Sequence, residues 1–94
     1  MRALVLASAL LLAAPAFAQT ASTSATLANP APTGRIIIDG ATWTCEGAAC
    51  TATGGADQPA LRACRRVAAR LGAVTAFTWK GEALTAQQIA ACNA

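Results

Sequence analysis

Four cysteines and four clustered arginines are the residues of this sequence whose types and spacing could support chemistry. The cysteines are Cys45, Cys50, Cys64 and Cys92, and the arginines are Arg62, Arg65, Arg66 and Arg70. Paired thiols form disulfides in oxidising compartments, and guanidinium groups bind phosphate or carboxylate through parallel hydrogen bonds. The first set therefore indicates covalent stabilisation, and the second indicates anion binding.

Groups suited to catalysis are scarce. The sequence contains no His and no Tyr, which removes the usual general base and the Ser-His and Cys-His nucleophiles. A glycosidase-like carboxylate pair could be drawn only from Glu46 and Glu82, and carboxylates in loops are usually just solvated. Gly54 and Gly55 are not followed by the Lys and Ser or Thr of a phosphate-binding loop. We therefore expect a protein that is not an enzyme and holds no cofactor.

The N-terminus has the pattern of a secretory signal peptide. Arg2 and an apolar run over residues 3–14 precede the small-residue segment 16–18. Such a run is shorter than the roughly 20 residues that span a bilayer, so cleavage after Ala18 is favoured over an uncleaved membrane anchor. We expect residues 1–18 to be removed, leaving a soluble periplasmic or secreted chain without stable membrane insertion.

Residues 19–34 are small, polar and proline-containing, and they predict a disordered leader. Its Ser22 and Ser24 are the only serines after the signal. Order is expected to begin at Arg35, so that residues 35–94 form one domain. That domain has only twelve larger apolar side chains. Because so thin a core barely offsets chain entropy, disulfide bonds are expected to stabilise it.

The first part of this domain predicts a three-stranded meander over residues 35–38, 41–45 and 50–53. A β-branched run, the turn dipeptide Asp39-Gly40 and a period-two alternation point to a hairpin with a type I′ turn. The third strand repeats the alternation after a four-residue loop, Glu46 to Ala49.

The remainder predicts two helices and one later strand. Asp57 as N-cap and Gly72 as terminator bracket a helix over residues 58–71. Residues 73–79 predict a strand, and Thr85 with Gln88 forms a capping box that opens a helix over 86–92. The buried stripe of the first helix is expected to hold Leu61, Cys64, Val67, Ala68 and Leu71, and its arginines cover the opposite side. We predict an α+β fold with a small antiparallel sheet packed by two helices.

Four cysteines allow three pairings. Cys45 and Cys50 are expected to be cross-strand neighbours, whereas Cys64 and Cys92 each lie on the buried face of a helix. We therefore favour the pairs Cys45–Cys50 and Cys64–Cys92. A four-thiolate zinc site is disfavoured by the long spacing between Cys64 and Cys92, and a redox role by the lack of a C-x-x-C motif.

The arginine-bearing helix face is the best candidate for function, although an ordinary solvated face would have the same composition. Its ligands would be anionic envelope components, such as lipid headgroups or lipopolysaccharide, or an acidic protein. Nucleic acid is disfavoured because no aromatic residue alternates with the arginines. Trp43 and Trp79 are expected in the core, with Trp79 the more exposed of the two.

The combined pattern D-G-x-x-W-x-C-x4-C, P-x4-C-R, V-x2-F-T, a Gly and a closing C-N resembles a family of small exported proteins of alphaproteobacteria. It is carried by Asp39, Gly40, Trp43, Cys45, Cys50, Pro59, Cys64, Arg65, Val74, Phe77, Thr78, Gly81, Cys92 and Asn93. The likeness covers residues 35–94. The resemblance implies an exported α+β domain and transfers no active site.

Together these features favour an exported, non-enzymatic binding protein of the cell envelope, with its partner unknown. The alternative is a secreted enzyme inhibitor or protective factor that inserts a disulfide-braced loop, Glu46 to Ala49, into the cleft of its target.

Overall fold

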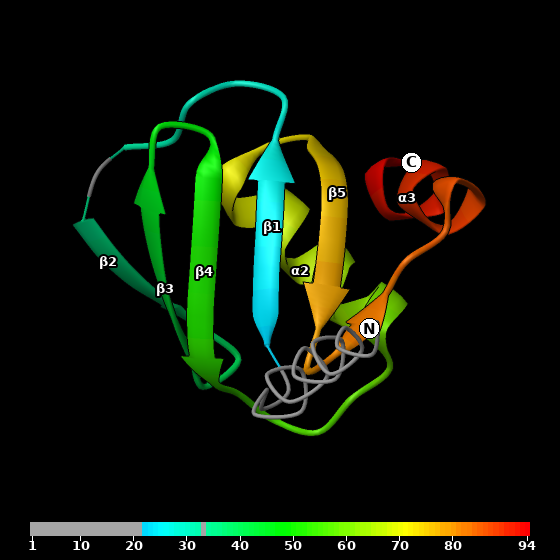
Figure 1. Cartoon of the computed structure of the whole chain (residues 1–94), viewed down its shortest axis with the longest axis horizontal. Coiled ribbons are helices and arrows are strands. Elements are labelled where there is room, and N and C mark those ends of the chain that lie inside the picture. Colours follow the sequence, from blue (N-terminus) through cyan, green and yellow to red (C-terminus); the bar gives the residue numbers. More distant parts are fainter. Residues whose placement is uncertain (1–21, 33) are drawn as a thin grey trace, which may run out of the picture.

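The computed structural model describes residues 22–32 and 34–94, so the predicted signal peptide at 1–18 lies outside the described residues. The described part forms two layers, with two helices on one face of a six-stranded sheet (Figure 1). In chain order the elements are β1 (Thr23–Leu27), β2 (Gly34–Ile38), β3 (Ala41–Glu46), β4 (Ala49–Gly54), α2 (Ala60–Leu71), β5 (Val74–Trp79), β6 (Glu82–Ala83) and α3 (Ala86–Asn93). The predicted α+β class is confirmed.

The sheet has the strand order β2-β3-β4-β1-β5-β6, and all neighbouring strands are antiparallel. The predicted meander is present as β2-β3-β4, with Ile36 opposite Trp43 and Cys45 opposite Cys50. The predicted later strand is β5. It does not lie beside β4, because β1 is inserted between them, so the sheet as a whole is not a meander.

The prediction that residues 19–34 form a disordered leader is wrong for Thr23–Leu27, which form the central strand β1. Alternate residues of this strand, Thr23, Ala25 and Leu27, are buried beneath the helices. The sequence argument considered buried apolar area, and Thr23 and Ala25 contribute little of it, so the strand was not predicted. β1 forms backbone hydrogen bonds with neighbouring strands on both sides, and its small side chains suit the face that the helices cover closely.

The start of β1 is also fixed by the turn between β5 and β6. The Gly81 N–H donates to the Ser22 carbonyl at 2.8 Å, and the Lys80 N–H donates to the Thr23 hydroxyl at 3.0 Å. Lys80 and Gly81 both have positive φ, as the two central residues of a type I′ hairpin turn require. Order in the domain therefore begins well before Arg35.

α2 begins at Ala60, two residues later than predicted. The expected N-cap, Asp57, does not cap the helix: its side chain is fully exposed and its carboxylate lies 3.0 Å from Lys80 Nζ. Pro59 occupies the cap position with an extended backbone and no side-chain cap. Gly72 ends the helix as predicted, with a φ of 106° that favours glycine.

The buried face of α2 is formed by Ala60, Ala63, Cys64 and Val67, whereas Leu61, Ala68 and Leu71 are only half-buried. The predicted stripe is thus rotated toward two alanines. Their small side chains let the helix lie close to the sheet.

No helix within the described ranges is long and apolar enough to cross a membrane.

α3 opens with the predicted capping box: Gln88 N–H donates to the Thr85 hydroxyl, and Thr85 N–H donates to the Gln88 side chain. At its other end the Asn93 amide forms two hydrogen bonds with the backbone of Val74, at 2.8 and 2.7 Å. The last turn of α3 is therefore attached to the first residue of β5.

Three aromatic rings form a stack in the core. Trp43 and Phe77 have ring centroids 6.0 Å apart, and Phe77 and Trp79 have centroids 6.3 Å apart. Trp79 is the more exposed of the two tryptophans, as expected, but only slightly: 4% of it is exposed against 0% of Trp43, so both belong to the core. Its ring lies against Gly55, where a side chain would collide with it, and Lys80 Nζ lies 5.5 Å from the ring centroid.

Both predicted disulfides are present, Cys45–Cys50 and Cys64–Cys92. The first links β3 to β4, and the second links α2 to α3, so each joins two elements of one layer. All four cysteines are buried.

Removing the two disulfides should have unequal effects, because stabilisation increases with the length of the closed loop. The pairs are separated by 5 and 28 residues. We expect Cys64→Ala with Cys92→Ala to lower the free energy of unfolding by about 3.5 kcal/mol, and Cys45→Ala with Cys50→Ala to lower it by about 2 kcal/mol. Urea denaturation measures both losses. Equal losses of unfolding free energy, or a urea unfolding curve that neither pair of substitutions changes, would contradict this expectation.

Gly55→Ala should destabilise the fold more than Gly72→Ala. Both glycines have a φ of 106°, so both substitutions place an alanine in a region that L residues rarely adopt. A Cβ at Gly55 would lie 2.7 Å from Trp79, whereas nothing lies within 4 Å of one at Gly72. We expect an additional loss of about 1–3 kcal/mol at Gly55 from overpacking. Thermal unfolding of the two variants measures the difference in stability. Equal losses would show that the packing of the Trp79 ring does not require a glycine at position 55.

Candidate functional site

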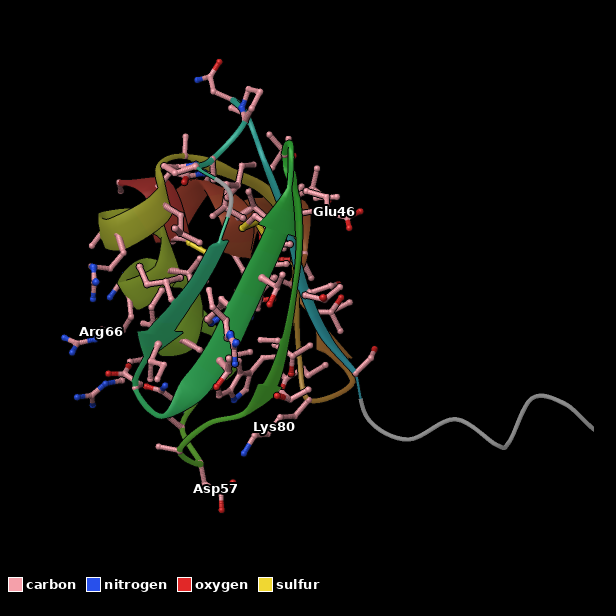
Figure 2. The ribbon with its side chains drawn as sticks, turned by 90° about the vertical axis from the view of Figure 1, so that its left-hand side faces the viewer. Glu46, Asp57, Arg66 and Lys80 are labelled. Atoms are coloured by element: carbon pink, nitrogen blue, oxygen red, sulfur yellow. A yellow bond between two sulfur atoms is a disulfide. The ribbon has the colours of Figure 1, made fainter. Side chains whose placement is uncertain are left out.

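α2 exposes all four of the arginines that the sequence singled out, Arg62, Arg65, Arg66 and Arg70. The helix is amphipathic as predicted, because its other side is buried against the sheet and α3. The arginine-bearing side of the molecule, marked by Arg66, lies opposite Glu46 in Figure 2. The helix therefore concentrates positive charge on one side of the fold.

Arg66 is the one of the four that forms an ion pair in the described part of the chain. Its Nε and Nη2 donate to the two carboxylate oxygens of Asp39, each at 3.1 Å. Gln58 Nε2 donates to the same carboxylate at 3.3 Å. Asp39 belongs to the tight turn between β2 and β3, with a φ of 49°. The pair thus connects the edge hairpin to the middle of α2.

These contacts favour the charged form of Asp39. The hydrogen bonds from the Arg66 guanidinium, followed by the one from Gln58, lower the pKa of the Asp39 carboxyl below its ordinary value of 3.8. The Asp39 side chain is 23% exposed and that of Arg66 is 58% exposed, so solvent screens the pair. The contact is better described as fixing the position of the turn than as a large source of stability.

An open cleft of about 380 Å³ lies around this pair. It is lined by Asp39, Ala56, Asp57, Gln58, Arg62 and Arg66. The lining holds two carboxylates as well as two guanidiniums, so the cleft is not simply positive. Arg62 is the cationic group there that has no ion pair within the described residues.

The other two arginines lie in separate hollows. Arg65 lines one of about 260 Å³ beside the end of α3, and its Nε approaches the Ala91 carbonyl at 3.5 Å. Arg70 lines another of about 270 Å³ beside β2, together with Arg35 and Leu71. The structure therefore brings Arg62 and Arg66 together and places Arg65 and Arg70 apart from them. The four do not form a single site.

Sequence reasoning missed the partners of these arginines. Asp39 was interpreted only as a turn residue, and the proximity of Arg35 to Arg70 depends on packing between β2 and α2. The Asp39–Arg66 pair could have been suspected from an acidic residue at the tip of a hairpin that a helix must cover. Nothing in the local sequence indicates the proximity of Arg35 to Arg70.

The structure does not bring the carboxylates of the proposed glycosidase-like pair together. Glu46 ends β3 and Glu82 begins β6, with β4, β1 and β5 between these strands. Ser24 lies in β1 between Thr51 and Thr78. Within residues 22–32 and 34–94, no group of three or more Cys, Asp or Glu side chains is placed to hold a metal ion.

The loop expected at Glu46 to Ala49 is a two-residue turn, because Glu46 and Ala49 pair with each other as strand residues. The turn is also fixed by β1 and the segment that follows it: the Leu27 N–H, at the end of β1, donates to the Ala48 carbonyl at 2.8 Å, and the Ala31 N–H donates to the Gly47 carbonyl at 2.9 Å. A two-residue turn whose carbonyls are hydrogen-bonded to the rest of the domain presents little surface for insertion into the cleft of another protein.

The pH dependence of stability should reveal the pairing of Asp39. Because the folded-state pKa is lowered, the interaction stabilises the fold above the pKa of the unfolded chain, about 3.9, and is lost as pH falls through the folded value. We expect Asp39→Asn, which keeps a residue suited to positive φ, to lower Tm at neutral pH, with the difference from wild type vanishing in acid. Arg66→Gln should lose the same pH-dependent part. A Tm difference constant from neutral pH to pH values well below the lowered pKa would contradict the pairing.

The family model described as a family of unknown function, DUF8200, matches residues 7–94. This match reaches further toward the N-terminus than the resemblance over residues 35–94, and it includes the central strand β1. No curated protein and no solved structure matches the chain. Because the matched region is most of the sequence, the chain belongs to the DUF8200 family of unknown function.

Proposed function

We propose that this chain is an exported, non-enzymatic protein of the cell envelope that binds anionic groups through the exposed arginines of α2. The observation that carries this proposal is the arrangement of charge on one helix. All four arginines are exposed, and only Arg66 has a carboxylate partner among the described ion pairs. Arg62, Arg65 and Arg70 are therefore available to a ligand.

The spacing of these arginines favours a ligand with repeated anionic groups. Arg62 and Arg70 are eight residues apart, which corresponds to about 12 Å along a helix. Together with Arg65 they line three different hollows, so one small anion could not contact them all. A surface of lipid headgroups or lipopolysaccharide presents phosphates at several points, and a guanidinium suits phosphate through its forked donors.

Two further features support export. The N-terminal residues have the pattern of a signal peptide. Two disulfides in a chain of 94 residues are typical of proteins that fold in an oxidising compartment. A periplasmic or secreted protein would meet anionic envelope components directly.

The proposal predicts salt-sensitive binding to anionic vesicles. The mature protein should co-sediment with vesicles of phosphatidylglycerol and phosphatidylcholine at low ionic strength, and a variant with Arg62→Gln, Arg65→Gln and Arg70→Gln should bind at least tenfold more weakly, because each lost cation removes about 1 kcal/mol of attraction. Arg66 is left in place so that its pair with Asp39 still supports the fold.

Matched variants separate this effect from a general change in charge. Arg62→Lys, Arg65→Lys and Arg70→Lys together keep the charge and should retain most of the binding. Arg35→Gln removes one cation outside α2 and should have a smaller effect than the triple Gln variant. Equal binding of the wild type and the triple Gln variant, at matched thermal stability, would refute the proposal.

A further inference from the structure

One edge of the sheet is open to pairing, and the other is not. The edge strand β6 has only two residues, so it offers little to pair with. The opposite edge strand, β2, has five residues and contains no Pro and no Lys. Natural proteins shield exposed edges with short strands, charged side chains (Lys above all) or Pro, because unpaired backbone groups accept strands from other chains. Of these devices β2 has one charged side chain, Arg35.

The hairpin geometry identifies which backbone groups of β2 are free. A two-residue turn of this kind is closed by a hydrogen-bonded pair, here Ile38 and Ala41. Hydrogen-bonded and non-hydrogen-bonded pairs alternate along an antiparallel ladder, so Arg35 and Ile37 direct their N–H and C=O groups away from β3. No other hydrogen bond reaches these groups within the described part of the chain.

The side chains along this edge are also unusual. Ile37 is 64% exposed, and it is the one large hydrophobic side chain exposed among the described residues. On the helix side of the strand, the hollow of about 270 Å³ has Ile36 and Leu71 in its apolar lining and Arg70 beside them. The edge thus combines free backbone groups, an apolar contact and two arginines, Arg35 and Arg70.

We infer that β2 is a docking edge for an extended, acidic segment of another protein, which adds as an antiparallel strand beside Arg35 and Ile37. Four backbone hydrogen bonds with these two residues would hold the segment, as in other cases of strand addition. This inference shares Arg70 with the anion-binding proposal, but it rests on the free backbone edge of β2, which that proposal does not use, so peptide binding and vesicle binding are separate measurements.

The geometry specifies the sequence of the segment. A residue opposite Ile37 shares its face of the sheet and should be apolar and β-branched. The next residue faces the hollow, where the stem of a Glu would cover Ile36 and Leu71 while its carboxylate meets Arg70. The third lies opposite Arg35 and should be acidic. In the antiparallel direction this pattern is Val-Glu-Glu.

Charge argues against a second copy of this chain as the occupant. Two β2 edges paired with each other would bring Arg35 and Arg70 of both copies along one seam. The nearest acidic residue of the hairpin, Asp39, is already paired with Arg66. An acidic partner neutralises these arginines, whereas a second copy doubles the positive charge.

The test uses the mature protein and a blocked peptide, acetyl-Thr-Thr-Val-Glu-Glu-Thr-Thr-amide. At saturation, hydrogen exchange of the Arg35 and Ile37 amides, followed by NMR, should slow at least tenfold, while exchange at Thr51 in the centre of the sheet stays unchanged. Arg70→Gln should weaken the peptide affinity about tenfold, which is the loss of one charge-assisted contact. Arg65→Gln, on the same helix beside α3, is the matched control and should change it less than twofold.

Peptide variants keep the test independent of any effect on folding. Replacing both Glu residues of the peptide with Gln should weaken binding at least tenfold, and N-methylation of its Val should abolish the protection of Ile37. The inference is overturned if millimolar peptide leaves both amides unprotected, or if the Gln peptide binds as tightly. It is equally overturned if both amides are already protected in the free protein and sedimentation equilibrium gives a dimer, since a second copy then occupies the edge. Vesicle binding of the wild-type protein is measured separately, and its failure would refute the anion-binding proposal alone.

Discussion

The insertion of β1 between β4 and β5 is the constraint on which the rest of the structure depends. Within residues 22–32 and 34–94, the β2-β3-β4 hairpins and the β5-β6-α3 region have no strand contact except through this segment. Two of its three buried residues, Thr23 and Ala25, are small and contribute little apolar area, and the strand forms backbone hydrogen bonds with neighbours on both sides. A five-residue strand of Thr, Ser, Ala and Leu therefore determines whether the domain has one sheet or two fragments.

The residues that carry the family resemblance are mostly explained by this architecture. Asp39 and Gly40 form a turn, Trp43, Val74 and Phe77 fill the core, the four cysteines form disulfides, and Asn93 binds the backbone of Val74. A pattern of this kind specifies a fold and leaves the surface free to vary. The arginines of α2 other than Arg65, and the residues of the β2 edge, lie outside this pattern. The fold does not require particular residue types at these positions.

Local signals made part of this structure predictable. The Asp39-Gly40 turn fixes the register of the β2–β3 hairpin, and the short connection after Glu46 places Cys45 opposite Cys50 in the β3–β4 hairpin. The capping box of α3 is equally local. β1 was missed because its strand partners lie 23 to 54 residues away in the sequence, which no property of its own composition reveals. The candidate site was predictable only as a helix face. The helical periodicity gives the direction of each arginine, but whether it meets Asp39, Ala91 or Arg35 depends on the packing of distant elements.

The position of the cysteines along the chain has a consequence for how the correct links arise. In the export that we propose, the polypeptide emerges N-terminus first, so the β3–β4 hairpin can close its own bond while the later segments are still to appear. Cys64 then pairs with Cys92, which follows it by 28 residues. With the hairpin thiols already consumed, one combination remains of the three that four thiols allow. In the proposed export, the order of appearance therefore favours the native connectivity, and an oxidant that acts before emergence is complete would promote the native pairs.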